Sequence, residues 1–225
     1  MINNPSIAFM LSRTWFWTGL WDGLRLTLYI SAVSIALAFI FGIIVGVARY
    51  SKLPVVSQIA TAYIEFLRNI PLVLLMFFCF LVLQLPQLTA AITALTLFTT
   101  AVIAEVVRGG LNSVSKGQWE AARSQGMNYL QILRHVVLPP AVTKMIPPIV
   151  SQFVTAIKDS SFALVIGVFE LVYSSNSLKG LFPAVGQTLT IYAVVAGIYF
   201  TINFAFSLVA RYLQKRLSAG GGTIS

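Results

Sequence analysis

Charged side chains interrupt some of the most apolar stretches of this 225-residue chain. In each of three places an acidic and a basic residue are adjacent or three positions apart: Glu65, Arg68, Glu105, Arg108, Lys158 and Asp159. A charge at the centre of a membrane-spanning helix costs roughly 2.5–3.5 kcal/mol on insertion scales, so such a side chain usually faces protein or water. These three places are therefore the first candidates for chemistry.

A polar amino acid moving along such a path would need both signs of charge. Its carboxylate requires a cation or amide donors, and its ammonium group requires a carboxylate. Arg68 and Asp159 could supply these roles, with Asn69 and Ser160 as hydrogen-bonding neighbours. The candidate pathway residues are therefore Arg68, Asp159, Glu65, Lys158, Ser160 and Asn69.

The alternative interpretation is that these charges form ion pairs between packed helices. It is stronger for Glu105 and Arg108, because Arg108 stands at the end of its apolar stretch, where a long side chain can reach the interface. Both interpretations stay open at this point.

Few residues of this chain could carry catalysis. It has one histidine, His135, and one cysteine, Cys79, without the Cys/His spacing of a metal site. It has no G-x-x-x-x-G-K segment, so we do not expect it to bind ATP. We therefore predict that the chain is not an enzyme and holds no metal or other cofactor of its own.

The composition predicts an all-α membrane protein. Hydrophobic residues make up 58% of the chain and charged residues 9%, and the mean hydropathy is +0.87. A soluble domain cannot bury that much apolar surface. The net charge of +9 could suggest nucleic acid, but Lys and Arg gather in particular loops rather than along one basic face. We predict contact with membrane lipid and none with nucleic acid.

Five membrane-spanning helices are predicted in a single transmembrane domain over residues 1–217. Their approximate ranges are 26–48, 58–83, 88–107, 144–169 and 187–210. Pro86 and its polar neighbours Gln84 and Gln87 mark the turn between the second and third spans. The connections include a polar loop at 109–143 and a second loop at 170–186, and residues 218–225 form a Gly-rich, disordered tail.

The distribution of basic residues predicts the orientation. With the amino terminus outside and the carboxyl terminus inside, the outer segments hold Arg13, Arg25 and Lys179. The inner segments then hold Arg49, Lys52, Arg108, Lys116, Arg123, Arg134, Lys144, Arg211, Lys215 and Arg216. This excess fits the positive-inside rule and makes the loop 109–143 cytoplasmic.

Residues 115–140 are the longest polar, helix-compatible segment. Ser115 with Gln118, and Asn128 with Gln131, are plausible capping boxes for two short helices. Gly126 lies between the two pairs, where a left-handed backbone costs least. Pro139 and Pro140 are expected to end the second helix.

The spacing in this segment resembles a family signature. Glu120-Ala121-Ala122, then Gly126, then Val136-Val137-Leu138-Pro139 is similar to the EAA signature of ATP-binding-cassette importer permeases. Val136 departs from the pattern, which prefers Ile there, by one methylene. Residues 65–72, 104–110 and 158–161 look like the polar amino acid, glutamine/glutamate-type, branch of that family. The resemblance spans roughly residues 20–212, nearly the whole chain.

This resemblance implies the permease subunit of a type I importer in a bacterial cytoplasmic membrane. Residues 115–140 would lie in a groove of a cytoplasmic ATPase and carry its motion into the membrane. Partners would be two ATPase subunits that bind ATP and Mg, a second permease subunit (homodimer or heterodimer) and an extracytoplasmic amino-acid-binding protein. The implied coupling residues are Glu120, Ala121, Ala122, Gly126, Trp119, Leu138 and Pro139, with Leu130 as a further apolar anchor.

Three rival functions fit the sequence less well. A secondary carrier would need a charge relay and usually internal repeats, and it would leave the EAA-like loop without a role. A membrane-embedded enzyme would need clusters of His, Cys or acidic residues. A structural membrane subunit would have no transport path. The sequence does not reveal which amino acid is moved.

Overall fold

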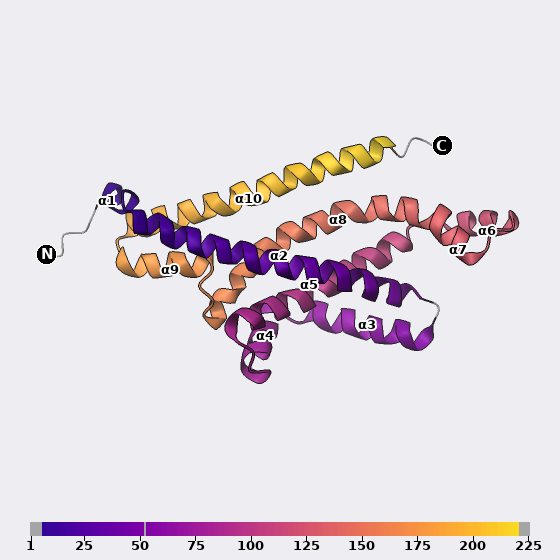
Figure 1. Cartoon of the computed structure of the whole chain (residues 1–225), viewed down its shortest axis with the longest axis horizontal. Helices are drawn as coiled ribbons and strands as arrows, with labels where there is room; N and C mark the ends of the chain where they lie inside the picture. The colour runs from indigo at the N-terminus through magenta and orange to yellow at the C-terminus, as the bar shows by residue number, and fades with distance from the viewer. Residues whose placement is uncertain (1–5, 52, 221–225) are drawn as a thin grey trace. The chain divides into compact units, whose positions relative to one another are not determined.

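The computed structural model describes residues 6–51 and 53–220, and these residues form helices and connections without a strand (Figure 1). The chain divides into two compact units, each described by itself below. Unit 1 comprises residues 1–35, 71–96 and 155–205, and unit 2 comprises residues 36–70, 97–154 and 206–225. Helices α2 (Thr14–Tyr50), α5 (Gln87–Leu111), α8 (Leu138–Asp159) and α10 (Val185–Gly220) contribute residues to both units.

Four helical stretches are long and apolar enough to cross a membrane: Thr14–Tyr50, Gln87–Leu111, Tyr129–Ile166 and Val185–Arg216. A fifth span results if α3 (Pro54–Asn69) and the helix Leu72–Val82 are counted together. That helix consists of α4 (Leu72–Phe77) and the π-helix η1 (Phe78–Val82). The predicted all-helical membrane fold is thus confirmed, with four to five candidate spans.

The predicted second span is broken in its middle. Ile70 has an extended backbone (φ −97°, ψ 133°), and Pro71 follows at φ −58°, ψ 132°. Proline lacks an N–H and disfavours the helical conformation of the residue before it, so α3 has to end here. The segment predicted as one helix over 58–83 is therefore two helices.

The expected stop at Pro139 and Pro140 is wrong. The π-helix η2 (Leu133–Val137) leads directly into α8, which begins at Leu138 and also contains Pro147 and Pro148. The prolines follow the wider π-turn of η2, in which the Leu138 N–H bonds the Leu133 carbonyl, and a proline after such a turn does not end the helix. Helix therefore continues from α7 (Tyr129–Ile132) through η2 and α8 to the 3₁₀-helix η3 (Ser160–Ile166).

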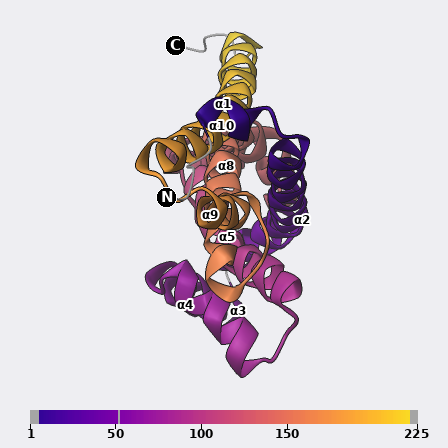
Figure 2. The same ribbon diagram turned by 90° about the vertical axis from the view of Figure 1, so that its left-hand side faces the viewer.

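The hydrophobic core of unit 1 is formed by side chains of α1 (Ile7–Leu11), the start of α2, α9 (Leu171–Leu181) and the first part of α10 (Figure 2). The core residues are Met10, Phe16, Leu20, Leu171, Leu178, Phe182, Ile191 and Val195. Helix α9 lies in the stretch that the sequence analysis treated as a loop at 170–186. In the same unit α4 packs against η3.

In unit 2 the end of α2 and the end of α5 pack against the segment after residue 115. That segment begins with α6 (Lys116–Ser124). The buried core consists of Ala38, Ile103, Val107, Leu111, Ala122, Ile132, Val137, Ala141, Met145 and Ile149. Because Ala122, Ile132 and Val137 belong to this core, residues 115–140 are packed onto the helices that lead into the membrane.

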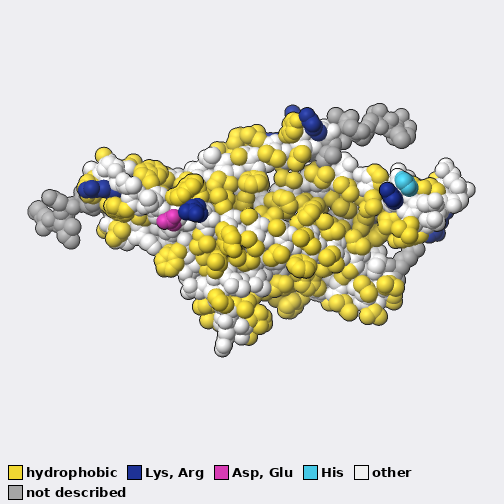
Figure 3. Space-filling view, viewed as in Figure 1, with side chains coloured by type: hydrophobic (Ala, Val, Ile, Leu, Met, Phe, Trp, Pro, Cys, Tyr) yellow, Lys and Arg dark blue, Asp and Glu magenta, His cyan; other side chains and the backbone are white. Residues whose placement is uncertain are grey.

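Apolar side chains cover much of the surface in view (Figure 3). Large hydrophobic residues such as Ile44, Ile59, Leu189 and Phe200 are more than half exposed. Such a surface is unfavourable in water but suits the hydrocarbon layer of a bilayer. Helix α10 ends at Gly220, three residues into the predicted tail; the remaining residues of that tail, 221–225, lie outside the described ranges.

Two glycines let α2 approach α5 closely in unit 2. A Cβ atom at Gly46 would lie 2.7 Å from the Ala104 carbonyl oxygen and 2.7 Å from the Val107 Cβ, and one at Gly42 would meet Ile103 at 2.6 Å. Small residues spaced four apart allow close helix packing in membranes.

We expect Gly46→Ala to lower the free energy of unfolding by about 1–3 kcal/mol, because the added methyl group must push two helices apart. The matched control is Gly197→Ala in α10, where a Cβ meets nothing within 4 Å. That control should be neutral or slightly stabilising, since alanine favours helix over glycine by about 1 kcal/mol. Thermal unfolding of both variants in detergent measures the difference; equal midpoints would contradict the close-packing argument.

Candidate functional site

Helix α6 presents polar side chains on one face and is anchored by the other. The Ser115 hydroxyl accepts a hydrogen bond from the Gln118 N–H at 3.4 Å and caps the helix. Ala122 is buried, and Trp119 packs against the unit 2 core. Glu120 and Ala121 are exposed. The helix is thereby fixed in place while the Glu120 carboxylate stays available to a partner.

The predicted pair of short helices joined at a glycine is present. Gly126 has φ +77°, a left-handed conformation that side chains rarely adopt, and α7 follows. Asn128 and Gln131 form a complete capping box, with N···O distances of 2.8 and 2.9 Å. Leu130 is 75% exposed, so the described part of the chain leaves the predicted apolar anchor mostly uncovered.

The end of the EAA-like signature starts a long helix rather than a loop. Leu138 and Pro139 are both exposed in the first turn of α8. Ile132 and Val137, on either side of η2, are buried in the unit 2 core. Because the helix is continuous from α7 into α8, a displacement of α7 can reach α8 without crossing a flexible linker.

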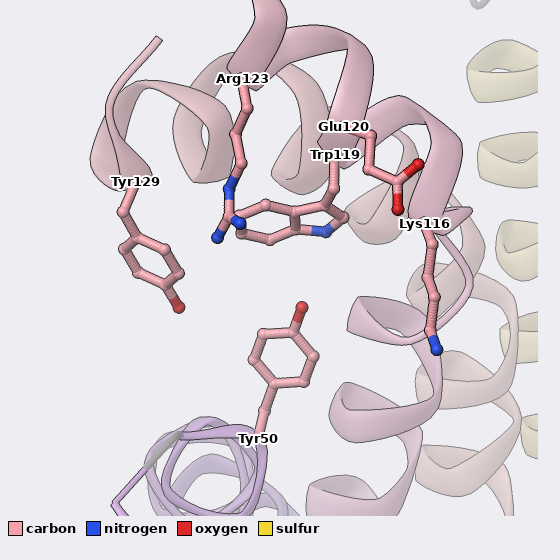
Figure 4. Close-up of a pocket in the computed structure, with 6 residues that line it drawn as sticks. All are labelled: Tyr50, Lys116, Trp119, Glu120, Arg123 and Tyr129. Atoms are coloured by element: carbon pink, nitrogen blue, oxygen red, sulfur yellow. The ribbon is translucent and has the colours of Figure 1, made fainter.

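A cavity of about 430 Å³ opens beside α6 (Figure 4). It is lined by Tyr50, Lys116, Trp119, Glu120, Arg123 and Tyr129. The rings of Trp119 and Tyr129 contact each other, with centroids 5.5 Å apart. Trp119 and Glu120 were predicted as site residues, and the other four were not. Tyr50 could not be predicted, because it comes from α2, far away in the sequence.

Glu105 is the centre of an ion-pair network in unit 2. Its carboxylate accepts hydrogen bonds from Arg49 at 2.5 Å and from Arg108 at 2.6 and 3.0 Å, and it lies 3.9 Å from Arg68. Arg49 also reaches Glu65 at 3.4 Å. The network therefore connects α2, α3 and α5, and the predicted pairing of Glu105 with Arg108 is present.

The candidate pathway residues fall into both units. In unit 2, Glu65 and Arg68 belong to the ion-pair network, and the Asn69 amide donates to the Glu65 backbone carbonyl at 2.6 Å. Arg68 is 45% exposed at its side chain and makes the longest contact of the network, so it is the cation most easily released from it.

In unit 1, Lys158 is exposed and Asp159 half-buried at the end of α8. The Ser160 hydroxyl is fully buried and donates to the Ile157 carbonyl at 2.8 Å, which leaves it a weaker candidate for a passing substrate. Within the described residues no cation lies at ion-pair distance from Asp159. The η3 segment, which begins at Ser160, contacts α4, which begins directly after Pro71.

Sequence analysis missed a fully buried carboxylate, Glu170, which caps α9 in unit 1. It accepts hydrogen bonds from the N–H groups of Val172 and Tyr173 at 2.9 and 2.8 Å, and from the hydroxyls of Tyr199 and Thr27 at 3.3 and 3.5 Å. These partners belong to α9, α10 and α2. The residue stands in a stretch that looks like a loop, and no neighbouring sequence signal indicates its burial.

Burial raises the pKa of the Glu170 carboxyl, although the hydrogen bonds from Val172 and Tyr173 act in the opposite direction. A folded-state pKa above the unfolded value makes a contribution to stability that is present at low pH and is lost as pH rises through the raised pKa.

We therefore expect Glu170→Gln, which cannot titrate, to change the pH dependence of unfolding. As the pH rises above about 4, the ordinary pKa of a glutamate, the unfolding midpoint of the wild type should fall relative to that of the variant. Midpoints that stay parallel across this range would contradict the raised pKa.

Comparison with known proteins adds to this geometry. Residues 38–219 match the family described as binding-protein-dependent transport system inner membrane component. The chain belongs to this family. As the membrane component of such a transport system it lies in the cytoplasmic membrane and is not itself an enzyme, and ATP hydrolysis belongs to a separate subunit.

This permease is 45% identical over 202 residues to the probable glutamine ABC transporter permease protein GlnP of Bacillus subtilis (strain 168), covering 88% of the chain and 93% of the relative. It is 31% identical over 216 residues to the glutamine transport system permease protein GlnP of Escherichia coli (strain K12), covering 89% and 97%. These relatives confirm the predicted resemblance to the polar amino acid branch.

Solved structures agree. This permease superposes with a TM-score of 0.84 on a structure described as an amino acid ABC transporter with histidines, at 26% identity and covering 92% of the chain and 98% of that chain. A TM-score of 0.70 relates it to the MetNI methionine ABC transporter in an inward-facing conformation, at 22% identity and covering 89% and 99%. The type I importer permease fold is thereby confirmed.

Proposed function

We propose that this chain is the permease subunit of an ATP-driven importer for glutamine or a closely related polar amino acid. The observation that carries the proposal is the 45% identity, over 93% of its length, to a relative named as a glutamine permease. The side-chain amide of glutamine is uncharged, so the protein has to bind only one carboxylate and one ammonium group. A path with few charged side chains fits such a substrate.

Residues 115–140 are proposed as the element that couples the permease to its ATPase. In support, α6 and α7 are packed onto the unit 2 core through Ala122 and Ile132, while Glu120 and Leu130 project outward. Ala121 is small and exposed, so a partner surface could approach it closely. Gly126 supplies the bend, and the first turn of α8, with Leu138 and Pro139, would receive the displacement.

The proposed orientation has the amino terminus outside and the carboxyl terminus in the cytoplasm. The distribution of Lys and Arg between the connections supports it. In this orientation α6 and α7 face the cytoplasm, where an ATPase that binds ATP and Mg would dock. Two ATPase subunits, a second permease copy or sister permease, and an extracytoplasmic amino-acid-binding protein would complete the transporter.

Two polar points are proposed along the substrate path, Arg68 in unit 2 for a carboxylate and Asp159 in unit 1 for an ammonium group. The half-exposed Arg68 guanidinium, held at 3.9 Å from Glu105, supports its part, because a substrate carboxylate could compete for it. Among the described residues no cation lies at ion-pair distance from Asp159. Its carboxylate could therefore bind the ammonium group of the substrate. Glu65, Lys158, Asn69 and Ser160 are the neighbours that would tune these two groups.

Substitution of either residue tests the path. Arg68→Ala and Asp159→Ala should each reduce uptake of labelled glutamine at least tenfold while the ATPase stays attached. Gln152→Ala, elsewhere on α8, is the matched polar control and should retain uptake. Loss of the ATPase together with uptake would mean that Arg68 and Asp159 support the fold rather than the substrate.

Co-purification tests the function itself. The chain, tagged at its carboxyl terminus and extracted from its native membranes, should bring down an ATPase and a second permease subunit, and the same cells should accumulate glutamine from a labelled amino acid panel. A chain that is recovered without any ATPase would overturn the proposal.

A further inference from the structure

The cavity beside α6 brings hydrogen-bond donors together (Figure 4). The hydroxyl groups of Tyr50 and Tyr129 point into the space that Arg123 and Trp119 also line. A guanidinium group donates only, and a tyrosine hydroxyl can donate. Such groups, arranged around one space of about 430 Å³, are suited to an oxyanion.

The charge around this cavity favours an acidic occupant. Glu120 also lines the cavity, but in Figure 4 its carboxylate lies on the Lys116 side of the indole, away from Tyr129. Between residues 115 and 140 Glu120 is the one acidic residue, against three basic residues, Lys116, Arg123 and Arg134. Opposite charge on a partner surface would therefore be attracted to this face.

The walls of the cavity are held in position before any partner arrives. Trp119 and Tyr50 both pack against the unit 2 core, and the Tyr129 ring rests against the Trp119 ring at 5.5 Å between centroids. Aromatic side chains with few rotatable bonds lose little entropy on binding. Of the donors, only the long Arg123 side chain would have to be ordered by the occupant.

We propose that this cavity receives a carboxylate side chain of the ATPase partner, bound by Arg123 and the hydroxyls of Tyr50 and Tyr129. The inference rests on the proposed coupling function and makes it specific. Helix α6 would offer two contacts of opposite sign, the Glu120 carboxylate to a basic group and the cavity to an acidic group. Two such contacts fix the register of docking better than one.

Retention of the ATPase on the tagged permease tests this inference. Arg123→Gln should retain about tenfold less ATPase than the wild type, and Arg123→Glu less still. Lys179→Gln, the same loss of one charge on α9, should retain the wild-type amount. If Arg123→Gln fails to fold, Tyr129→Phe removes only a hydroxyl and should still weaken retention severalfold.

Charge reversal identifies the partner group. Single Asp or Glu to Lys substitutions over the permease-facing surface of the ATPase are combined with Arg123→Glu, and one of them should restore retention. Rescue by none of them, or full retention by Arg123→Gln, would overturn the inference.

Two further outcomes separate this inference from its alternatives. If the wild-type permease retains no ATPase, the coupling function fails and the cavity proposal with it. If the permease alone binds inorganic phosphate, loses that binding in Arg123→Gln, and retains the ATPase unchanged, the cavity is a site for a free anion and the docking proposal is wrong.

Discussion

Replacement of Glu120 with lysine is expected to reduce ATP-driven uptake more than tenfold while the chain still inserts and folds. Glu120 is exposed on α6, so the substitution disturbs no buried contact. It places three cations, at positions 116, 120 and 123, on one helical face, which costs the helix only about 0.5 kcal/mol. A basic group on the ATPase would, however, meet repulsion instead of attraction.

Uptake and ATP hydrolysis are measured together in membrane vesicles. Hydrolysis that persists without uptake indicates uncoupling, and loss of the ATPase indicates failed docking. Glu120→Gln should be intermediate, and Asp22→Lys, a charge reversal on α2 in unit 1, should leave uptake unchanged. Wild-type uptake in the lysine variant would remove Glu120 from the coupling element.

Removal of the Glu105 charge is expected to destabilise unit 2 substantially. Glu105→Gln leaves Arg49, which is 15% exposed, and Arg108 without their shared carboxylate. Breaking a buried pair costs roughly 3–5 kcal/mol. Because the Glu105 side chain is 25% exposed, we expect a loss of about 2 kcal/mol in the free energy of unfolding.

The matched control is Glu65→Gln, the same change in the same network at a side chain that is 63% exposed. It should cost less than about 0.5 kcal/mol. Thermal unfolding in detergent, at low and at high salt, separates the two. Equal effects of both substitutions would show that Glu105 is not the centre of the network.

Local signals were sufficient to predict the two short helices within residues 115–140. The caps at Ser115 and Asn128 and the left-handed Gly126 act over three or four residues, so the sequence alone indicates two short helices and the bend between them. The effect of Pro139 and Pro140 was predicted wrongly. A proline usually ends a helix, but Pro139 directly follows the π-helix η2, and the helix continues past it.

Tertiary contacts could not be predicted from the sequence. Arg49 and Glu105 are 56 residues apart, and nothing local indicates that their helices bring them together. Helix α9 was missed because its Ser, Asn and Gly residues favour a loop and its stability comes from Leu171 and Leu178 in the unit 1 core. The predicted first span began only after Asp22 and Arg25, because these residues are charged, whereas α2 begins at Thr14. Both charges are exposed, and exposed charges are compatible with a helix that extends beyond the bilayer.

Transport in a defined membrane tests the central claim most directly. The permease, its co-purified ATPase and the binding protein are placed in liposomes, and accumulation of labelled glutamine is measured with ATP, with a non-hydrolysable ATP analogue, and with an ion gradient alone. We predict accumulation with ATP only, and its loss in the Glu120→Lys variant. Accumulation driven by the ion gradient without ATP would contradict the account and indicate a secondary carrier.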